Sequence, residues 1–162
     1  GRDLITLNDL NKLFPNDKAK TLREGVNRLV KNGLLTRVGK GVYLYTLSNS
    51  QDAHTVEHIA KALRRGEYNY ISLESALSEY GAISQIPIDH LTVMTTGRKG
   101  TYKTPFGTIE FTHTKRAVSD ILKNISEVGR PLRFAKASAA WRDLKRVGRN
   151  LHLVNQEGLT ND

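Results

Sequence analysis

The chain has 162 residues, a formal net charge of +9 and no cysteine. This length suits one domain or two small ones, with enough chain to bury a hydrophobic core. Without cysteine, disulfides, thiol catalysis and thiolate zinc sites are excluded, which is typical of a cytoplasmic protein. The apolar runs are too short to cross a bilayer, and we expect neither a signal segment nor a membrane partner.

Positive charge is concentrated at the two ends of the chain. Residues 1–48 hold nine Lys and Arg against four Asp and Glu, and residues 97–162 hold thirteen against six. The middle, 49–96, holds three against six and is mildly acidic. This distribution indicates a polyanionic partner, nucleic acid before membrane, although a basic solvated surface would account for it equally well.

The first fifty residues carry two helical patterns. Leucines and Phe14 at helical spacing predict a helix over 7–14, which Pro15 ends. A second helix is expected from Lys18 to Asn32, with Gly33 as its C-cap. Its predicted buried stripe has an i, i+3/i+4, i+7 spacing and comprises Ala19, Leu22, Val26, Leu29 and Val30.

A β-hairpin is expected directly after this helix. The segments "LLTRV" and "VYLYT" alternate and carry β-branched and aromatic residues, and "GKG" between them supplies positive-φ positions for a tight turn. Helix, turn, helix and hairpin is the order of a winged helix-turn-helix, whose second helix enters the major groove of DNA. We therefore predict a winged helix-turn-helix domain over 1–48.

The second helix and the hairpin supply side chains that suit DNA. Asn27, with Lys20 or Arg23, is the predicted base contact, because amide and cationic groups match the edges of adenine and guanine. The helix end and the hairpin supply phosphate contacts. The alternative is a charged face that only keeps the helix soluble. The predicted DNA-contacting residues are Lys18, Lys20, Thr21, Arg23, Asn27, Arg28, Lys31, Arg37 and Lys40, joined by Arg98 and Lys99 from a later basic loop.

Beyond a polar linker at 48–52, helical and strand patterns are mixed in an order typical of an α+β domain over 49–162. The predicted helices lie at 53–66, 72–81, 117–129 and 137–148, and the predicted strands at 70–71, 90–96, 101–104, 107–114, 130–135 and 150–154. The later helices are expected to bury Val118, Ile121, Leu122 and Ile125, and Ala140, Trp141, Leu144 and Val147. The overall fold class is therefore α+β.

Three stretches in this second part are "YISLESALSEYGAI", "TVMTTGRKGTYKTPFGTIEFTH" and "RFAKASAAWRDLKRVGRNLHLV". Together they resemble the AbiEi-type antitoxins of bacterial abortive-infection, type IV toxin–antitoxin systems. The first two motifs of that family match through Tyr70, Ser72, Ser75, Ala76, Leu77 and Gly81, and through Thr104, Pro105, Phe106, Gly107, Phe111 and His113. The third matches through Ala135, Ala140, Asp143 and Leu144, but Ala137 and Ser138 replace its usual Pro and Glu.

The resemblance covers nearly the whole chain and implies a two-domain, DNA-binding antitoxin. It implies that the winged helix represses the protein's own operon at inverted repeats in the promoter. It also implies that the C-terminal domain counters a nucleotidyltransferase-type toxin, without a stable complex between the two proteins. The alternative is a protein-interaction module whose basic surfaces bind an acidic partner, such as the toxin itself.

Enzyme motifs are weak. "HTVEH", with His54 and His58 one helical turn apart and Glu57 between them, matches the pattern of inverted zinc peptidases, but no third ligand is evident. "GRKGTYKT" lacks the phosphate-loop spacing. Ser72 is explained as an N-cap, and neither it nor Ser75 has an evident His or Asp partner. We expect no catalytic residue, no metal and no cofactor.

Overall fold

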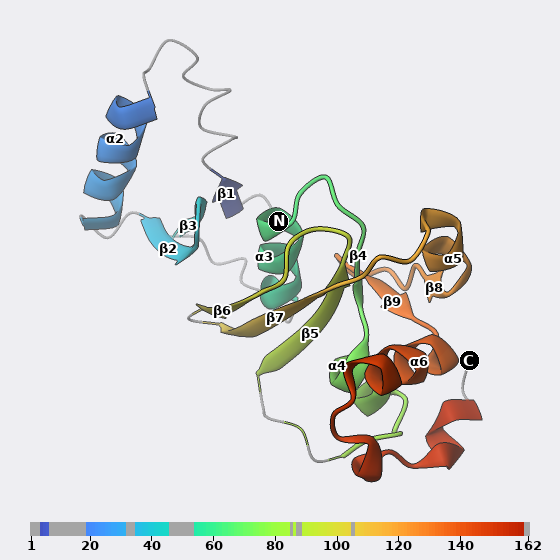
Figure 1. Cartoon of the computed structure of the whole chain (residues 1–162). Coiled ribbons are helices and arrows are strands. Elements are labelled where there is room, and N and C mark those ends of the chain that lie inside the picture. The colour runs from blue at the N-terminus through green and yellow to red at the C-terminus, as the bar shows by residue number, and fades with distance from the viewer. Residues whose placement is uncertain are drawn as a thin grey trace.

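The computed structural model describes residues 4–6, 19–31, 35–45, 54–84, 86, 89–104 and 106–160. It is a mixed α+β structure with a three-stranded and a six-stranded sheet (Figure 1), which confirms the predicted class at that level. The predicted helix over 7–14, the cap at Gly33 and the linker at 48–52 lie outside the described residues.

The N-terminal helix packs against a three-stranded sheet. Its strand order is β1-β3-β2 and every pairing in it is antiparallel. Val26 of α2 packs with Leu35 and Tyr43 of the sheet in a small buried cluster, which Val30 covers. The elements are β1 (Leu4–Thr6), α2 (Ala19–Lys31), β2 (Leu35–Gly39) and β3 (Val42–Tyr45). The predicted second helix and hairpin are thus confirmed, whereas β1 was not predicted because three residues show no measurable period.

The six-stranded sheet forms the body of the protein. Its order is β6-β7-β5-β4-β9-β8, with parallel pairs β7–β5 and β4–β9 and antiparallel pairs elsewhere. The strands are β4 (Asn69–Ile71), β5 (His90–Thr95), β6 (Gly100–Thr104), β7 (Gly107–His113), β8 (Ile125–Ser126) and β9 (Arg133–Ala135).

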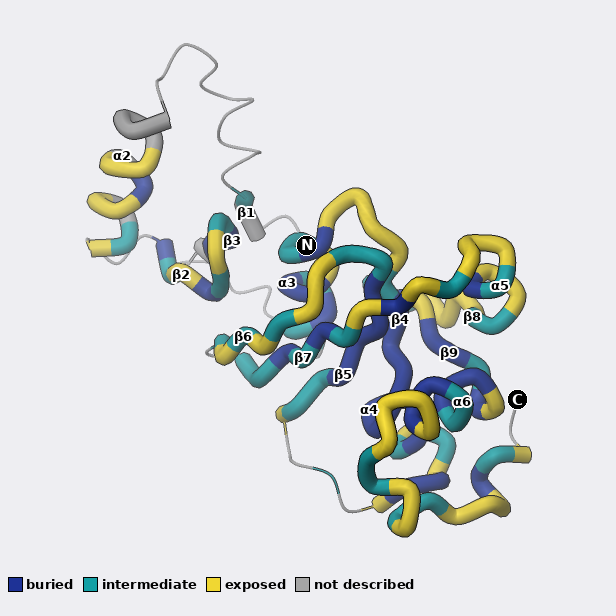
Figure 2. The backbone as a smooth tube through the Cα atoms, in the orientation of Figure 1, coloured by how far each residue is buried: buried dark blue, intermediate teal, exposed yellow. Residues whose placement is uncertain are grey.

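Helices cover both faces of the central strand β5. Thr92, Val93, Met94 and Thr95 are all buried although their side chains alternate between the faces, and Figure 2 shows β5 dark blue there. Both α4 and α3 pack against β5, and α6 packs against α4. The helices are α3 (Thr55–Leu63), α4 (Leu73–Glu79), α5 (Val118–Lys123) and α6 (Ala137–Val147), followed by the 3-10 turns η1 (Leu151–Leu153) and η2 (Gln156–Thr160).

The N-terminal hairpin is continuous with the main core. Val38 and Val42, on its two strands, belong to the same buried cluster as Ile59 of α3 and Val93 of β5. A methyl group at Gly39 would lie 2.9 Å from a terminal carbon of Leu63, also on α3. The body of the protein therefore holds the hairpin by apolar packing, and in Figure 1 α2 projects away beyond it.

Two C-terminal predictions are wrong. The helix predicted over 117–129 stops at Lys123, because the chain turns at Asn124 and Ile125 pairs with Ala135. Val118 and Leu122 are consequently 41% and 45% exposed. The strand predicted at 150–154 is instead η1, which follows a left-handed Asn150 with φ of 57°.

α6 also departs from its predicted stripe. Ala140 and Leu144 are buried as expected, but Val147 is 38% exposed and Trp141 is half-buried beneath the ammonium group of Lys145. Asp143 is only 1% exposed. The helix is therefore rotated so that a carboxylate, not the indole ring, points into the core.

Gly158 provides a test of the C-terminal packing. A Cβ added there would lie 2.6 Å from the Cα of Ala82, a backbone atom that cannot move aside alone. We predict that Gly158→Ala lowers the free energy of unfolding by about 1–3 kcal/mol, as overpacked cores do. Gly39→Ala is the matched control, because its methyl meets only the flexible end of Leu63. Equal losses in urea unfolding for both variants would contradict this packing.

Candidate nucleic-acid interface

The outer face of α2 carries four of the predicted DNA contacts. Arg23, Asn27, Arg28 and Lys31 are exposed, while Val26 on the opposite side is buried. Three of them line an open hollow of about 420 Å³ together with the carboxylate of Glu24. Lys18 lies outside the described residues, as do the side chains of Lys20 and Thr21. Amide and guanidinium groups on one accessible helix face are able to reach base edges in a major groove.

The hairpin adds two exposed cations. Arg37 lies on β2 and Lys40 in the turn, where the following Gly41 has a φ of 71°. The register shifts between Arg37 and Gly39, so that Gly39 and not Val38 pairs with Val42. This bulge turns Val38 inward while Arg37 and Lys40 remain in solvent.

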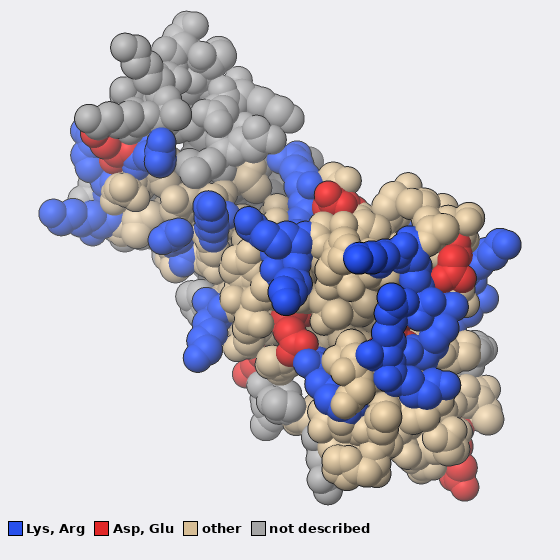
Figure 3. All heavy atoms as spheres, in the orientation of Figure 1, with Lys and Arg blue, Asp and Glu red and all other residues tan. Residues whose placement is uncertain are grey.

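The basic loop before β6 lies beside the C-terminal end of α3, where the hairpin also packs. The Nε atom of Arg64 donates a hydrogen bond to the carbonyl oxygen of Arg98 at 2.7 Å, while its neighbour Leu63 contacts Gly39 of the hairpin. Leu63, the last residue of α3, therefore holds the hairpin, and the next residue, Arg64, holds this loop. Arg98 and Lys99 of the loop are exposed. In Figure 3, Lys and Arg side chains extend from α2 across the region of β2 and β6.

The two basic ends of the chain differ in how their charge is used. Among the described residues, Arg28, Lys31, Arg37, Lys40 and Lys99 form no ion pair with an acidic side chain. Four of the thirteen cations in 97–162 are paired with carboxylates of the protein: Arg116 with Asp143, Arg130 with Glu57 and Glu79, Arg142 with Asp120, and Arg149 with Glu74 and Glu110. The exposed cations of α2 and the hairpin listed above therefore keep their charge available.

The residues of the first and third motifs meet in a buried cluster. The Ser72 hydroxyl donates to Oδ2 of Asp143 at 2.7 Å, and the Tyr70 hydroxyl lies 3.4 Å from the same oxygen. Nε of Arg116 lies 3.5 Å from Oδ1 of Asp143, which accepts no hydrogen bond among the described residues. Burial raises the pKa of Asp143 above its ordinary value, despite the hydrogen bond from Ser72 and the nearby guanidinium groups.

This cluster corrects the prediction for Ser72. The residue stands at the N-cap position of α4, but its hydroxyl makes no capping hydrogen bond and has an aspartate partner. The next residue, Leu73, has a left-handed φ of 58° at the sharp turn from β4 into α4. Because Ser72 is 0% exposed, the Ser–Asp contact is inaccessible to a substrate and joins α4 to α6.

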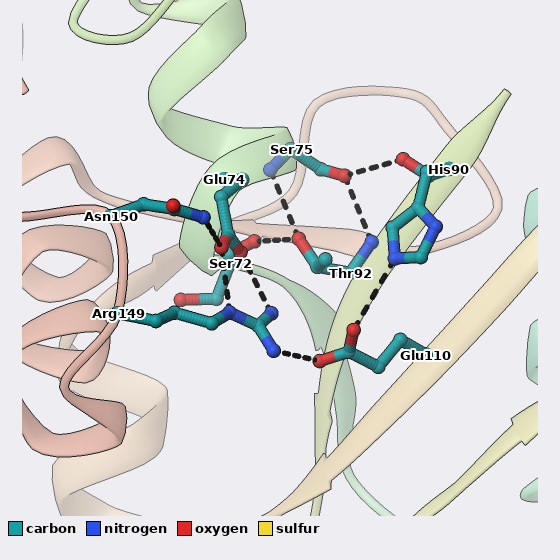
Figure 4. Close-up of polar contacts among 8 residues, drawn as sticks. All are labelled: Ser72, Glu74, Ser75, His90, Thr92, Glu110, Arg149 and Asn150. Atoms are coloured by element: carbon teal, nitrogen blue, oxygen red, sulfur yellow. Dashed lines mark hydrogen bonds and ion pairs between the residues drawn. The ribbon is translucent and has the colours of Figure 1, made fainter. Parts of the chain in front are cut away.

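The second polar network, drawn in Figure 4, ties α4 to β5 and to the chain after α6. Thr92 donates to the carbonyl oxygen of Ser72, and Ser75 and Thr92 exchange side-chain and backbone hydrogen bonds. Glu74 accepts two hydrogen bonds from Arg149, at 2.6 and 2.9 Å. Burial raises the pKa of Glu74, but the bonds from Arg149 and Asn150 outweigh it and bring that pKa below its ordinary value.

The T-P-F-G motif makes the turn between β6 and β7. The Thr104 hydroxyl accepts from the amide of Phe106 and donates to the carbonyl oxygen of Gly107. Gly107 has a φ of 144°, and a Cβ there would lie 2.8 Å from the carbonyl oxygen of Asp89. Nδ1 of His113 donates a hydrogen bond to the carbonyl oxygen of Gly97, 2.7 Å away. These motif residues fix backbone geometry.

The glutamate of the "HTVEH" segment is bonded to other residues of the protein. Both carboxylate oxygens of Glu57 are used: Oε2 accepts from Arg130 at 2.6 and 2.9 Å, and Oε1 from the amide of Leu132. Nδ1 of His54 lies 3.2 Å from Oε2 of Glu57. Within the described part of the chain, no group of three or more His, Cys, Asp or Glu is arranged to hold a metal ion.

No protein-family model and no curated protein matches this chain. Among the described residues, no helix has both the length and the apolar character needed to cross a membrane.

The buried carboxylate predicts an unusual dependence of stability on pH. Because the folded pKa of Asp143 is raised, its contribution to stability is complete below the ordinary value of 3.8 and is lost as pH rises through the folded pKa. Asp143→Asn keeps the shape and removes the titration. We expect its melting temperature, relative to the unmodified protein, to be higher at pH 7 than at pH 4.

Glu74→Gln is the control of opposite sign. The folded pKa of Glu74 is lowered, so its contribution is present above the ordinary value of 4.5 and is lost as pH falls through the folded pKa. This variant should be less stable than the unmodified protein at pH 7, with a deficit that shrinks in acid. If Asp143→Asn followed the same trend, the charge on Asp143 would be stabilising, contrary to our interpretation.

Proposed function

We propose that this protein binds double-stranded DNA through α2 and the β2–β3 hairpin, as a winged helix-turn-helix. The observation that carries the proposal is the exposed face of Asn27, Arg28 and Lys31, continued by Lys40, with none of the three cations paired to a described carboxylate. A surface that only needed solubility would not require an amide among cations beside a lysine-tipped hairpin. The strand order β1-β3-β2, with α2 packed on it, also supports this proposal.

Within this proposal the DNA is the protein's own promoter. The protein represses its operon at inverted repeats and serves as the antitoxin of a type IV, abortive-infection system, countering a nucleotidyltransferase-type toxin in the cytoplasm without a stable complex. The support is the resemblance in three stretches, together with the direct contacts of Tyr70 and Ser72 from one stretch with Asp143 from another. Residues that carry the resemblance are thus physically coupled.

A second candidate function is a protein-interaction module for an acidic partner, such as the toxin. The observation in its favour is the mixture of apolar and basic groups on the C-terminal surface. Val118 and Leu122 of α5 are exposed near Lys115 and Lys123 in the sequence, and Val147 of α6 is exposed next to Arg146. Such a surface matches the aliphatic and acidic groups of a protein better than a sugar-phosphate backbone.

The salt dependence of binding distinguishes the two candidate functions. In gel shifts with DNA from directly upstream of the gene, log affinity should fall linearly with log salt, by about 0.9 for each phosphate neutralised. Lys40→Ala should weaken specific and random duplex alike and flatten the slope by about one unit. Lys123→Ala, an exposed lysine on α5, is the control and should leave the slope unchanged.

Asn27→Ala tests base recognition. Because a side-chain amide can make two hydrogen bonds to adenine, its loss should cost about 1–3 kcal/mol at one base position and leave binding to random duplex unchanged. Binding to a panel of single-base operator variants measures this. If upstream DNA and random duplex bind equally tightly, or both lose equally with Asn27→Ala, the proposal of sequence-specific recognition fails.

A further inference from the structure

A separate cavity opens at the C-terminal end of α3. It has a volume of about 310 Å³ and lies between the last turn of α3, the loop leading to β4, and strands β8 and β9. This is at the lower end of the range of about 300–1,000 Å³ that is usual for small-ligand sites. It suits a single compact ligand. The loop residues 65–68 at its rim are exposed, yellow in Figure 2.

Several of the residues that line the cavity are cationic. Lys61, Arg65 and Arg133 line it and are exposed. Lys61 and Arg133 take part in no side-chain hydrogen bond or ion pair with any residue that the structure describes. The acidic lining residue Glu67 accepts a hydrogen bond from the hydroxyl of Thr96 at 2.6 Å, in the loop after β5. The cavity therefore has an excess of positive charge.

The helix end does not cancel this charge. The last carbonyl groups of a helix carry partial negative charge and would repel an anion if they were bare. Here the carbonyl oxygen of Leu63 accepts from Nη1 of Arg64, and that of Arg64 accepts from the side-chain amide of Asn69. With both carbonyls bonded, Lys61 and Arg133 remain available to a phosphate group.

The lining of the cavity also contains apolar groups. Ile125 and Pro131 line it, and the ring of Tyr68 at its rim is 40% exposed. An exposed aromatic ring next to aliphatic groups offers a stacking surface for a flat heterocycle, and stacking tolerates any base. Cations and a stacking surface in one cavity match the phosphate and the base of a nucleotide.

From this juxtaposition we propose that the cavity binds a nucleoside phosphate. Its phosphate groups contact Lys61 and Arg133, with Arg65 at the rim, and its base stacks against Tyr68. The cavity is built from α3, β8 and β9 and does not include α2 or the β2–β3 hairpin. The proposal is therefore independent of DNA binding by α2.

Titration of the full chain with fluorescent mant-ATP and mant-GTP tests the proposal. We expect saturable binding of both, because stacking does not select a base. Lys61→Ala and Arg133→Ala should each weaken binding about tenfold, the usual scale for loss of one charge-assisted hydrogen bond. Lys123→Ala, on α5, is the matched control and should bind normally. Thermal unfolding shows whether each variant remains folded, which is expected because these side chains are exposed.

Tyr68→Ala separates a nucleotide from a bare phosphate ligand. It should weaken mant-nucleotide binding about tenfold and leave binding of inorganic tripolyphosphate, measured by calorimetry, unchanged. The proposal is overturned if neither nucleotide binds at millimolar concentration, if Lys61→Ala and Arg133→Ala bind normally, or if Tyr68→Ala has no effect. Gel shifts of the unmodified chain keep the two proposals separate: absent nucleotide binding with normal DNA binding means that only the cavity proposal has failed, and the reverse means that only the DNA proposal has failed.

Discussion

The buried guanidinium group of Arg64 holds together the surfaces on which both proposals depend. The residue is 7% exposed, and its nitrogens donate to the carbonyl oxygens of Leu63 and Arg98 and to the Tyr102 hydroxyl. Its charge also lies 4.4 Å from the centre of the Phe111 ring. A buried cation is tolerated only when its donors are satisfied, so removing any partner would expose a cost of several kcal/mol. The end of α3 is thereby held rigid.

Rigidity at this point positions the basic groups on either side of α3. The hairpin that carries Lys40 packs on Leu63, and the loop that carries Lys99 follows the Arg98 carbonyl. The cavity with Lys61 opens at the same helix end. A nucleic acid or a nucleotide would therefore meet cations whose backbone is already fixed, which lowers the entropy cost of binding.

The polar contacts of the C-terminal half pair some of its charges and join distant segments of the chain. Four of the thirteen cations in 97–162 are paired with carboxylates of the protein, as Arg149 is with Glu74 and Glu110. The buried Asp143 joins α6 to the turn before α4 through Ser72. These contacts join polar residues that lie far apart in the sequence, and satisfied polar networks favour one arrangement of the core.

Local sequence patterns were sufficient for most elements. Alternation and glycine placement predicted the β2–β3 and β6–β7 hairpins, and the apolar spacing of α2, α3, α4 and α6 predicted those helices. The exposure of Asn27, Arg28 and Lys31 also followed from the helical period, because a charged face opposite a valine stripe has only one orientation that avoids burying charge.

Only the tertiary structure decided which charged residues are internal. Arg64 and Arg65 are adjacent and have the same side chain, yet Arg64 is buried because the loop before β6 and β6 itself supply partners 34 and 38 residues away. Asp143 is buried and Trp141 half-exposed for the same reason, since Ser72 and Arg116 approach from distant segments. Val118 lacks a cover because α5 ends early. Periodicity reports which side of a helix prefers the interior, but it contains no information on the distant groups that make a buried charge acceptable.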